Sequence, residues 1–221
     1  MTPAERFRRA WSLLARRLGL TEVGTAVVDH YLVEQYTAAE RHYHGVDHIV
    51  YMIDQVDAQP ALSRDGGAAG LAAFFHDAIY DPSRDDNEVR SVADLHQLLD
   101  GVVAGPILAR AEAMILATRR HEPTGDDAID LFLDVDLSIL AASWAEYVRY
   151  AEGVRREYVP IHGEDGYRQG RLDLFLRPML ARGRVFLTDF YQVRDPKALA
   201  NLAREAEILE AGGALAPSPP R

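Results

Sequence analysis

Two adjacent side chains that can bind a metal ion, His76 and Asp77, lie inside the strongly apolar segment LAAFFHDAIYD at residues 71–81. An Asp is almost never buried among apolar residues unless it is paired or coordinates a metal. An HD dipeptide alone is most often structural, with the His bonded to a carbonyl group and the Asp at a helix end. The function of this pair therefore depends on which other metal-binding residues the chain supplies.

Side chains of the same chemical types lie in apolar surroundings in two other segments. His44 and His48 are four residues apart, and a continuous helix would present both imidazoles on one face to a metal ion or a substrate. Gly45, which lies between them, marks the expected start of a helix. Asp134 and Asp136 alternate in LDVDLS, and in an extended or helix-entry stretch they would point the same way. Only one of them need bind metal, and His48 can equally be a core residue.

Three more polar residues have both a functional and a structural interpretation. Glu88, in the first turn of an expected helix, can act at the site or complement the helix dipole. His121, just before the break at Pro123, can act at the site or be a cation at a helix C-terminus. Arg41 can hold a phosphate with its planar guanidinium or be a surface charge.

Apolar residues at spacings of three and four predict helices through almost the whole chain. Residues 185–193 could form a short extended piece, but no repeat, strand series or domain linker is present. We therefore expect an all-α protein, a single-domain helical bundle over residues 1–211 with a flexible tail at residues 212–221. The metal-site core is expected at about residues 30–160, and the C-terminal helices at about residues 164–211.

Composition excludes several classes of function. The net charge of −10, from 34 acidic and 24 basic side chains, argues against a protein that mainly binds the nucleic-acid backbone. With no Cys, thiolate catalysis and Cys-based metal sites are excluded, so any metal must be held by His and carboxylates. No apolar stretch approaches the roughly 20 residues of a membrane span, and the N-terminus lacks a signal peptide's apolar segment. We therefore expect a cytoplasmic protein that does not bind membranes.

Taken in chain order, a His, an adjacent His-Asp pair and a distant Asp resemble the HD-domain superfamily of metal-dependent phosphohydrolases, which has an all-helical fold. The segments RHYHGVDHI, FFHDAIYDP, DNEVRS, ILATRRHEP and LDVDLSILA look like its bacterial branch of predicted metal-dependent HD phosphohydrolases, over roughly residues 30–210. YHGVDH and DVDLS also resemble segments of cyclic-nucleotide phosphodiesterases, a distantly related helical fold.

The resemblance implies four ligands for one divalent ion, namely His48, His76, Asp77 and Asp136. Asp134 would then not bind the metal itself but lie next to the residues that do. Two imidazoles and two carboxylates form a mixed nitrogen and oxygen set that suits Mn, Fe, Co, Ni, Zn or Mg. Such an ion lowers the pKa of a bound water molecule towards about 7 and polarises the phosphorus centre.

The same resemblance gives roles to the residues around the metal. His44 would donate a proton to the leaving oxygen, and Asp77 or Glu88 would orient the attacking water. His121 and Arg41 would serve a second metal or the phosphate. The expected function is hydrolysis of a nucleotide or another small phosphate ester. Two alternatives remain open: a non-catalytic sensor that binds a nucleotide through the metal site, and a di-iron oxygenase of the HD fold, which needs more His ligands.

Overall fold

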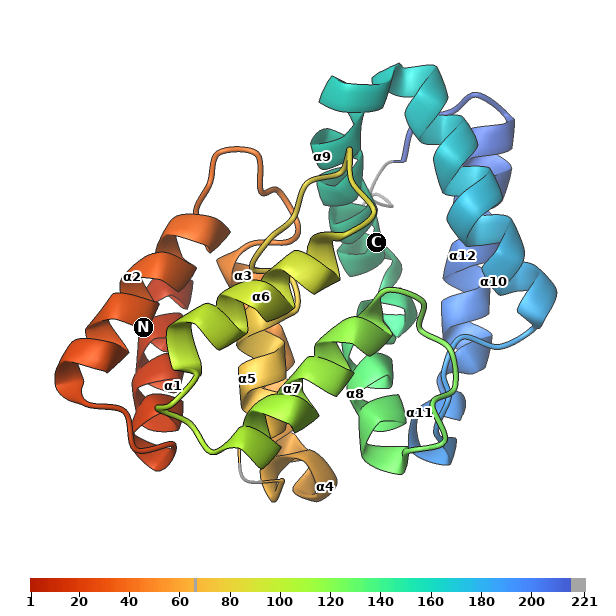
Figure 1. Ribbon diagram of the computed structural model, residues 1–221. Helices are drawn as coiled ribbons and strands as arrows, with labels where there is room; N and C mark the ends of the chain where they lie inside the picture. Colours follow the sequence, from red (N-terminus) through yellow and green to blue (C-terminus); the bar gives the residue numbers. More distant parts are fainter. Residues whose placement is uncertain (66, 216–221) are drawn as a thin grey trace. The chain divides into compact units, whose positions relative to one another are not determined.

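The computed structural model describes residues 1–65 and 67–215, and these residues form helices and loops with no β-strand (Figure 1). The prediction of an all-α protein is confirmed. The described residues divide into two compact units, residues 1–135 and the residues from Asp136 onward, and the boundary falls inside one helix. The single domain over residues 1–211 stays a prediction.

The first unit consists of the following helices: α1 (Pro3–Arg17), α2 (Glu22–Tyr36), α3 (Val46–Ala58), α4 (Pro60–Ser63), α5 (Ala68–Phe75), α6 (Asn87–Leu99), α7 (Gly105–Thr118) and α8 (Asp127–Leu137) as far as Val135. The first helix begins at a capping box, in which the Thr2 side chain accepts from the Glu5 N–H and the Glu5 carboxylate accepts from the Thr2 N–H. Thr21 caps α2 in a similar way, by accepting from the Gly24 N–H.

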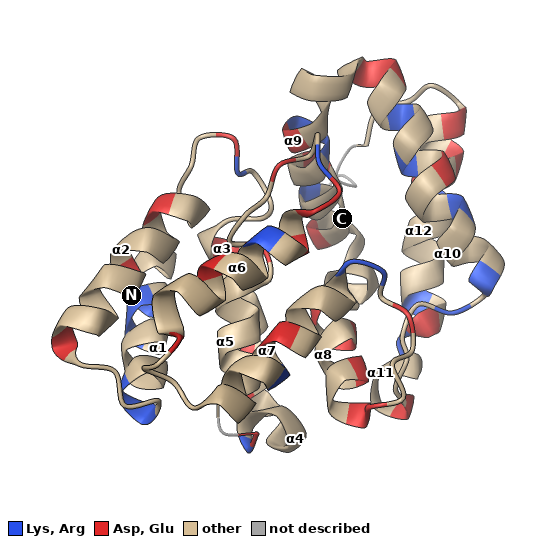
Figure 2. Cartoon of the chain, viewed as in Figure 1, with Lys and Arg blue, Asp and Glu red and all other residues tan. Residues whose placement is uncertain are grey.

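Helix α5 is the buried centre of the first unit and contacts α1, α3, α4, α6 and α7. Its sequence AAGLAAFF carries no charge, and Figure 2 shows it without acidic or basic residues. The ring of Phe74 meets the edges of Phe7 and Trp11 at centroid distances of 5.2 and 5.3 Å. A helix that is apolar on all sides must be covered on all sides, so the end of α5 is held firmly in the core.

Gly67 permits the close packing of α5 against α1. Its φ of 105° lies in the region that favours glycine, and a Cβ there would lie 3.1 Å from both Leu14 and Leu18. A larger residue at this position would therefore strain the backbone and require the ends of the Leu14 and Leu18 side chains to shift.

The second unit contains the end of α8 and the following elements: a 3₁₀ turn η1 (Ser138–Ala141), α9 (Trp144–Gly170), a π-helical stretch η2 (Arg171–Leu176), α10 (Arg177–Arg182), α11 (Asp189–Gln192) and α12 (Asp195–Glu210). Helix α9 is kinked at Gly163, whose φ of 70° is not helical, three residues after Pro160. Residues 185–193 do not form the extended piece considered from sequence, because α11 occupies residues 189–192.

Polar side chains on α12 organise the interior of the second unit. Asn201 donates to the carbonyl oxygens of Leu140 and Ala142, at 2.8 and 3.0 Å, and so holds the turn that follows α8. One helical turn later, Glu205 accepts from Arg171 of η2 at 3.0 Å.

Part of the predicted tail, residues 216–221, lies outside the described residues, whereas Leu215 is buried. Among the described residues, no helix combines the length and the hydropathy that a membrane crossing requires.

Candidate metal centre

His76 lies at the C-terminal end of α5 and caps this helix. Its backbone N–H donates to the carbonyl oxygen of Ala72 at 2.8 Å, and its ring Nδ1 lies 3.1 Å from the carbonyl oxygen of Ala73. Because a carbonyl oxygen can only accept, Nδ1 is the donor in this contact and Nε2 is the ring nitrogen that faces His48 and Asp77. A histidine whose Nδ1 donates to a carbonyl oxygen in this way is oriented to bind a metal ion through Nε2.

His48, on α3, is 5% exposed and brings a second imidazole nitrogen to the same place. The Nε2 atoms of His48 and His76 are 3.2 Å apart. Ligand atoms about 2.1 Å from one ion lie about 3.0 Å apart at a right angle and about 3.4 Å apart at the tetrahedral angle. The spacing of the two rings therefore fits two ligands of one divalent ion.

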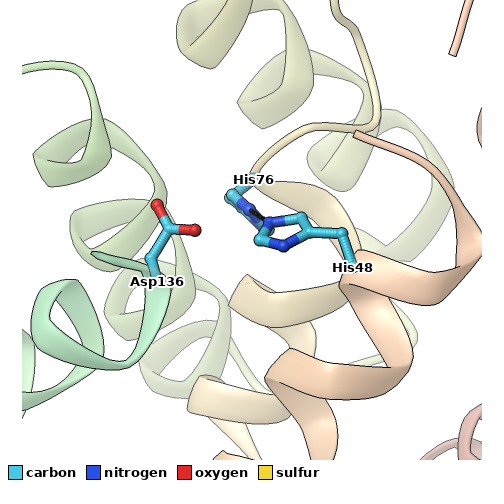
Figure 3. A group of neighbouring side chains, drawn as sticks. All are labelled: His48, His76 and Asp136. Atoms are coloured by element: carbon cyan, nitrogen blue, oxygen red, sulfur yellow. Dashed lines mark hydrogen bonds between the residues drawn. The ribbon is translucent and has the colours of Figure 1, made fainter. Parts of the chain in front are cut away.

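Helix α8 brings Asp136 to these imidazoles. Phe132, one turn earlier on the same face of α8, meets the His76 ring edge-on at a centroid distance of 6.3 Å. One ligand atom from each of His48, His76 and Asp136 lies within 4.8 Å of the other two. Figure 3 shows the Asp136 carboxylate beside the two rings. This cluster could hold a metal ion.

Asp77 places a further carboxylate beside the imidazoles. Its Oδ2 lies 3.0 Å from Nε2 of His76 and 3.6 Å from Nε2 of His48. Burial alone would raise the pKa of Asp77, but the imidazoles of His76, His44 and His48 together outweigh burial and hold this pKa below its usual range. Asp77 is therefore an anion at neutral pH, which is the form that attracts a cation or accepts a hydrogen bond from water.

Hydrogen bonds connect the chain that follows Asp77 to the first turns of α6. Ser91 Oγ accepts from the Ile79 N–H at 3.0 Å. Asn87 accepts from the Asp81 N–H at 3.1 Å and donates to the Asp81 carbonyl at 3.0 Å. Sequence reasoning missed these supports, because a single Ser or Asn near a helix start has no distinctive pattern. Their effect is to fix the backbone next to the candidate ligands.

His44 does not share a helix with His48, because α3 begins at Val46 after the N-cap residue Gly45. The predicted helix start at Gly45 is confirmed, and the continuous helix through His44 is wrong. The turn still places the centroid of the His44 ring 5.9 Å from that of the His48 ring. The His44 ring also stacks on the Tyr80 ring at a centroid distance of 4.0 Å. His44 is partly exposed and adjoins the cluster.

The two aspartates of LDVDLS do not point the same way. Both lie on α8, where residues two apart differ in direction by about 200°, so the extended alternative is wrong. Asp134 is fully buried and does not belong to the cluster that contains Asp136. Phe132 was the available sequence signal for the face of α8 that meets His76, since it precedes Asp136 by one helical turn.

Glu88 and His121 lie outside the His48–His76–Asp136 cluster. Burial raises the pKa of Glu88 and the charge of Asp77 raises it further, while Arg119 and His121 lower it. His121 has a φ of 48°, in the left-handed region that non-glycine residues rarely adopt and that occurs often at functional sites. Their roles in catalysis or in a second metal or phosphate site stay predictions.

The guanidinium group of Arg41 is bonded to main-chain carbonyl groups next to the candidate ligands. It donates to the carbonyl oxygens of His44, Asp77 and Ala78 at 2.9, 2.7 and 2.9 Å. Arg41 is thus part of the structure around the His-Asp pair rather than a solvent-facing charge.

The fold and the cluster together define an all-helical protein with a candidate divalent-metal site made of two imidazoles and a carboxylate. Comparison with known proteins finds no family model, no curated protein and no solved structure that matches this chain.

Proposed function

We propose that this protein is a metal-dependent phosphohydrolase of the HD-domain type that hydrolyses a nucleotide or another small phosphate ester. The observation that carries the proposal is the meeting of His48, His76 and Asp136, from three distant parts of the sequence, with ligand atoms within 4.8 Å of one another. Two buried imidazoles and a carboxylate suit a first-row divalent ion such as Mn, Fe, Co, Ni or Zn, and Mg is a further candidate.

The residues around the cluster support hydrolysis. His48, His76 and Asp136 would hold a divalent ion, and that ion would supply Lewis-acid chemistry, namely a more acidic water molecule and positive charge for the phosphoryl oxygens. Asp77, held as an anion, orients the water by accepting its hydrogen bond, with Glu88 as the second candidate for this role. His44, whose ring lies close to that of His48 and which is partly exposed, would donate a proton to the leaving oxygen.

A small substrate fits this chain better than a nucleic acid. The net charge of −10 repels a long phosphate backbone, whereas one phosphate group needs only local neutralisation by a metal ion and a nearby cation. Arg119, which lowers the pKa of Glu88, is the cation expected near the phosphate, and His121, which also lowers this pKa, is a further candidate to contact the phosphate. The proposal retains the cytoplasmic location expected from the sequence.

The test is hydrolysis by purified, metal-depleted protein supplied separately with Mn²⁺, Co²⁺, Ni²⁺, Zn²⁺ or Mg²⁺. Phosphomonoesters, nucleoside triphosphates and cyclic nucleotides form the substrate panel. We expect turnover that requires a divalent ion and that falls at least about 100-fold in Asp136→Ala and in His48→Ala, since each change removes a metal ligand.

Matched controls separate the loss of a ligand from a general effect of substitution. Asp127→Ala removes an exposed carboxylate from the same helix as Asp136, and His30→Ala removes an exposed imidazole from α2. Both controls should retain turnover. Hydrolysis that persists in Asp136→Ala, or the absence of metal-dependent hydrolysis from every substrate, would falsify the proposal. Tight nucleotide binding without turnover would indicate a sensor instead.

A further inference from the structure

The end of α5 has carbonyl oxygens that the helix itself cannot satisfy, as at every helix C-terminus. The residues of the site supply the partners of two of them. The Ala73 carbonyl lies at hydrogen-bond distance from His76 Nδ1, 3.1 Å away, and the Phe74 carbonyl accepts from the Tyr36 hydroxyl at 2.9 Å. The carbonyls of Asp77 and Ala78, just beyond the helix, both accept from Arg41.

Arg41 reaches two chain segments at once. The same Nη1 that donates to Asp77 at 2.7 Å also donates to the carbonyl of His44 at 2.9 Å, in the turn that leads into α3. Nη2 donates to Ala78 at 2.9 Å. One planar group therefore connects the segment before His48 with the segment that contains the His-Asp pair.

Aromatic rings hold the guanidinium in this orientation. Its central carbon lies 5.2 Å from the centroid of the Tyr36 ring and 5.4 Å from that of the Tyr80 ring. The Tyr80 ring in turn stacks on the His44 ring at a centroid distance of 4.0 Å. The ring contacts therefore link the same two chain segments as the hydrogen bonds of Arg41. Gly45 completes the turn, because a Cβ there would lie 3.2 Å from the Tyr36 carbonyl oxygen.

We propose that Arg41 is a positioning residue of the metal centre, which fixes the spacing between His48 and the His76–Asp77 pair through three main-chain hydrogen bonds. This inference rests on the proposed metal-dependent function and states how that site is kept in shape. It assigns Arg41 main-chain partners in place of the phosphate expected from the sequence, because three of its five N–H donors are bonded to carbonyl oxygens.

Lys cannot replace Arg at this position. A guanidinium presents several N–H donors in a fixed plane, whereas an ammonium group is a single point at the end of a flexible stem. Lys would keep the positive charge and lose the simultaneous contact with His44, Asp77 and Ala78. The comparison of Arg41→Lys with the wild type therefore tests geometry at constant charge.

The experiment measures Co²⁺ affinity by competition with a chelator, and ligand geometry by the visible absorption of the Co²⁺ form. We expect Arg41→Lys and Arg41→Ala to bind Co²⁺ roughly 10- to 100-fold more weakly than the wild type, with an altered absorption band. Added methylguanidinium should restore affinity in Arg41→Ala and have no effect on Arg41→Lys. The matched control is Arg177→Lys, since Arg177 pairs with Asp173 and Glu210 in the second unit and should leave Co²⁺ binding unchanged.

A readout that needs no variant covers the case in which Arg41 substitutions unfold the protein. In ¹⁵N NMR of the wild type, the Arg41 side-chain N–H signals should be protected from solvent exchange, shift when Zn²⁺ binds and stay in place when inorganic phosphate is added. Signals that exchange freely or follow phosphate would overturn the inference.

The outcomes distinguish this inference from the proposed function. Equal Co²⁺ affinity in Arg41→Lys and the wild type overturns the positioning role and leaves the proposed function standing. Tight Co²⁺ binding that depends on Arg41, without hydrolysis of any phosphate ester, supports the positioning role and refutes the phosphohydrolase. A wild-type protein that binds no Co²⁺ or Zn²⁺ overturns both.

Discussion

Replacing Glu205 with Gln should strongly destabilise the second unit, because it leaves a buried positive charge without its partner. Glu205 is fully buried, and its carboxylate accepts from Arg171 at 3.0 and 3.1 Å and from the Tyr147 hydroxyl. Arg171 is itself 8% exposed and would retain the Tyr150 hydroxyl, at 3.2 Å, the rings of Tyr150 and Phe175, and the amide oxygen of the introduced Gln, but it would lose the opposite charge. Removing one partner of such a pair costs about 3 to 5 kcal/mol.

An exposed pair in the same unit gives the scale for comparison. Arg177 and Glu210 lie at the similar distance of 2.8 Å, but their side chains are 49% and 50% exposed. Water compensates such groups when the pair is broken, so Glu210→Gln should cost about 0 to 1 kcal/mol. The difference between the two losses of stability therefore measures the effect of burying an ion pair, and not the number of ion pairs.

Urea denaturation followed by near-ultraviolet circular dichroism measures both effects, since Tyr147 and Tyr150 contact the buried pair and Trp144 stacks on Tyr147. The double substitution Arg171→Met with Glu205→Leu removes both charges, and it should recover most of the stability that Glu205→Gln loses. A loss below about 1 kcal/mol in Glu205→Gln would refute the reasoning, because it would mean that Arg171 finds water or another partner without cost.

Two further predictions concern single residues of the first unit. His96 lies between Asp100 and Glu112, whose hydrogen bonds raise its pKa, so its contribution is present below an unfolded pKa of about 6.5 and is lost as the pH rises through the folded value. Because His96 is about one-third exposed, the free energy of unfolding of the wild type should exceed that of His96→Gln by about 0.5 kcal/mol at pH 5 and by less at pH 9. A difference in unfolding free energy that grows with pH would contradict this prediction. His121, with a φ of 48°, should tolerate Gly better than a β-branched residue. In urea titrations of metal-free protein, His121→Val should be about 1 to 2 kcal/mol less stable than His121→Gly, and equal stability would exclude the left-handed conformation.

The helical architecture was predictable from sequence because it depends on local periodicity. Apolar residues at spacings of three and four, together with Gly45 as a helix start, indicated helices that the structure confirms. Predictions were wrong where a short segment had two compatible readings. LDVDLS alternates like a strand but ends α8, and residues 185–193 have an extended-looking composition but contain α11.

The candidate ligands were predictable for a different reason. Buried His and Asp side chains in apolar segments are rare enough to be noticed one by one, which drew attention to His76 and Asp77, to His48, and to the pair Asp134 and Asp136. The resemblance to the HD-domain superfamily then implied the set His48, His76, Asp77 and Asp136. The structure brings His48 and His76 together with Asp136, and places Asp77 beside the two imidazoles. The metal itself, the reaction and the roles of His44 and Glu88 are predictions that the experiments above address.

The amino-acid sequence by itself determined the helices and the chemical types of the ligands, because both follow from the properties of residues near one another in the chain. Only the tertiary structure decided that Asp136 and not Asp134 meets the histidines, that the Ala73 carbonyl oxygen faces Nδ1 of His76, and that Arg41 binds carbonyl groups. These features depend on which helix faces meet and on where backbone carbonyls are left unsatisfied. These contacts arise from the packing of segments that are far apart in the sequence, and no local sequence pattern encodes that packing.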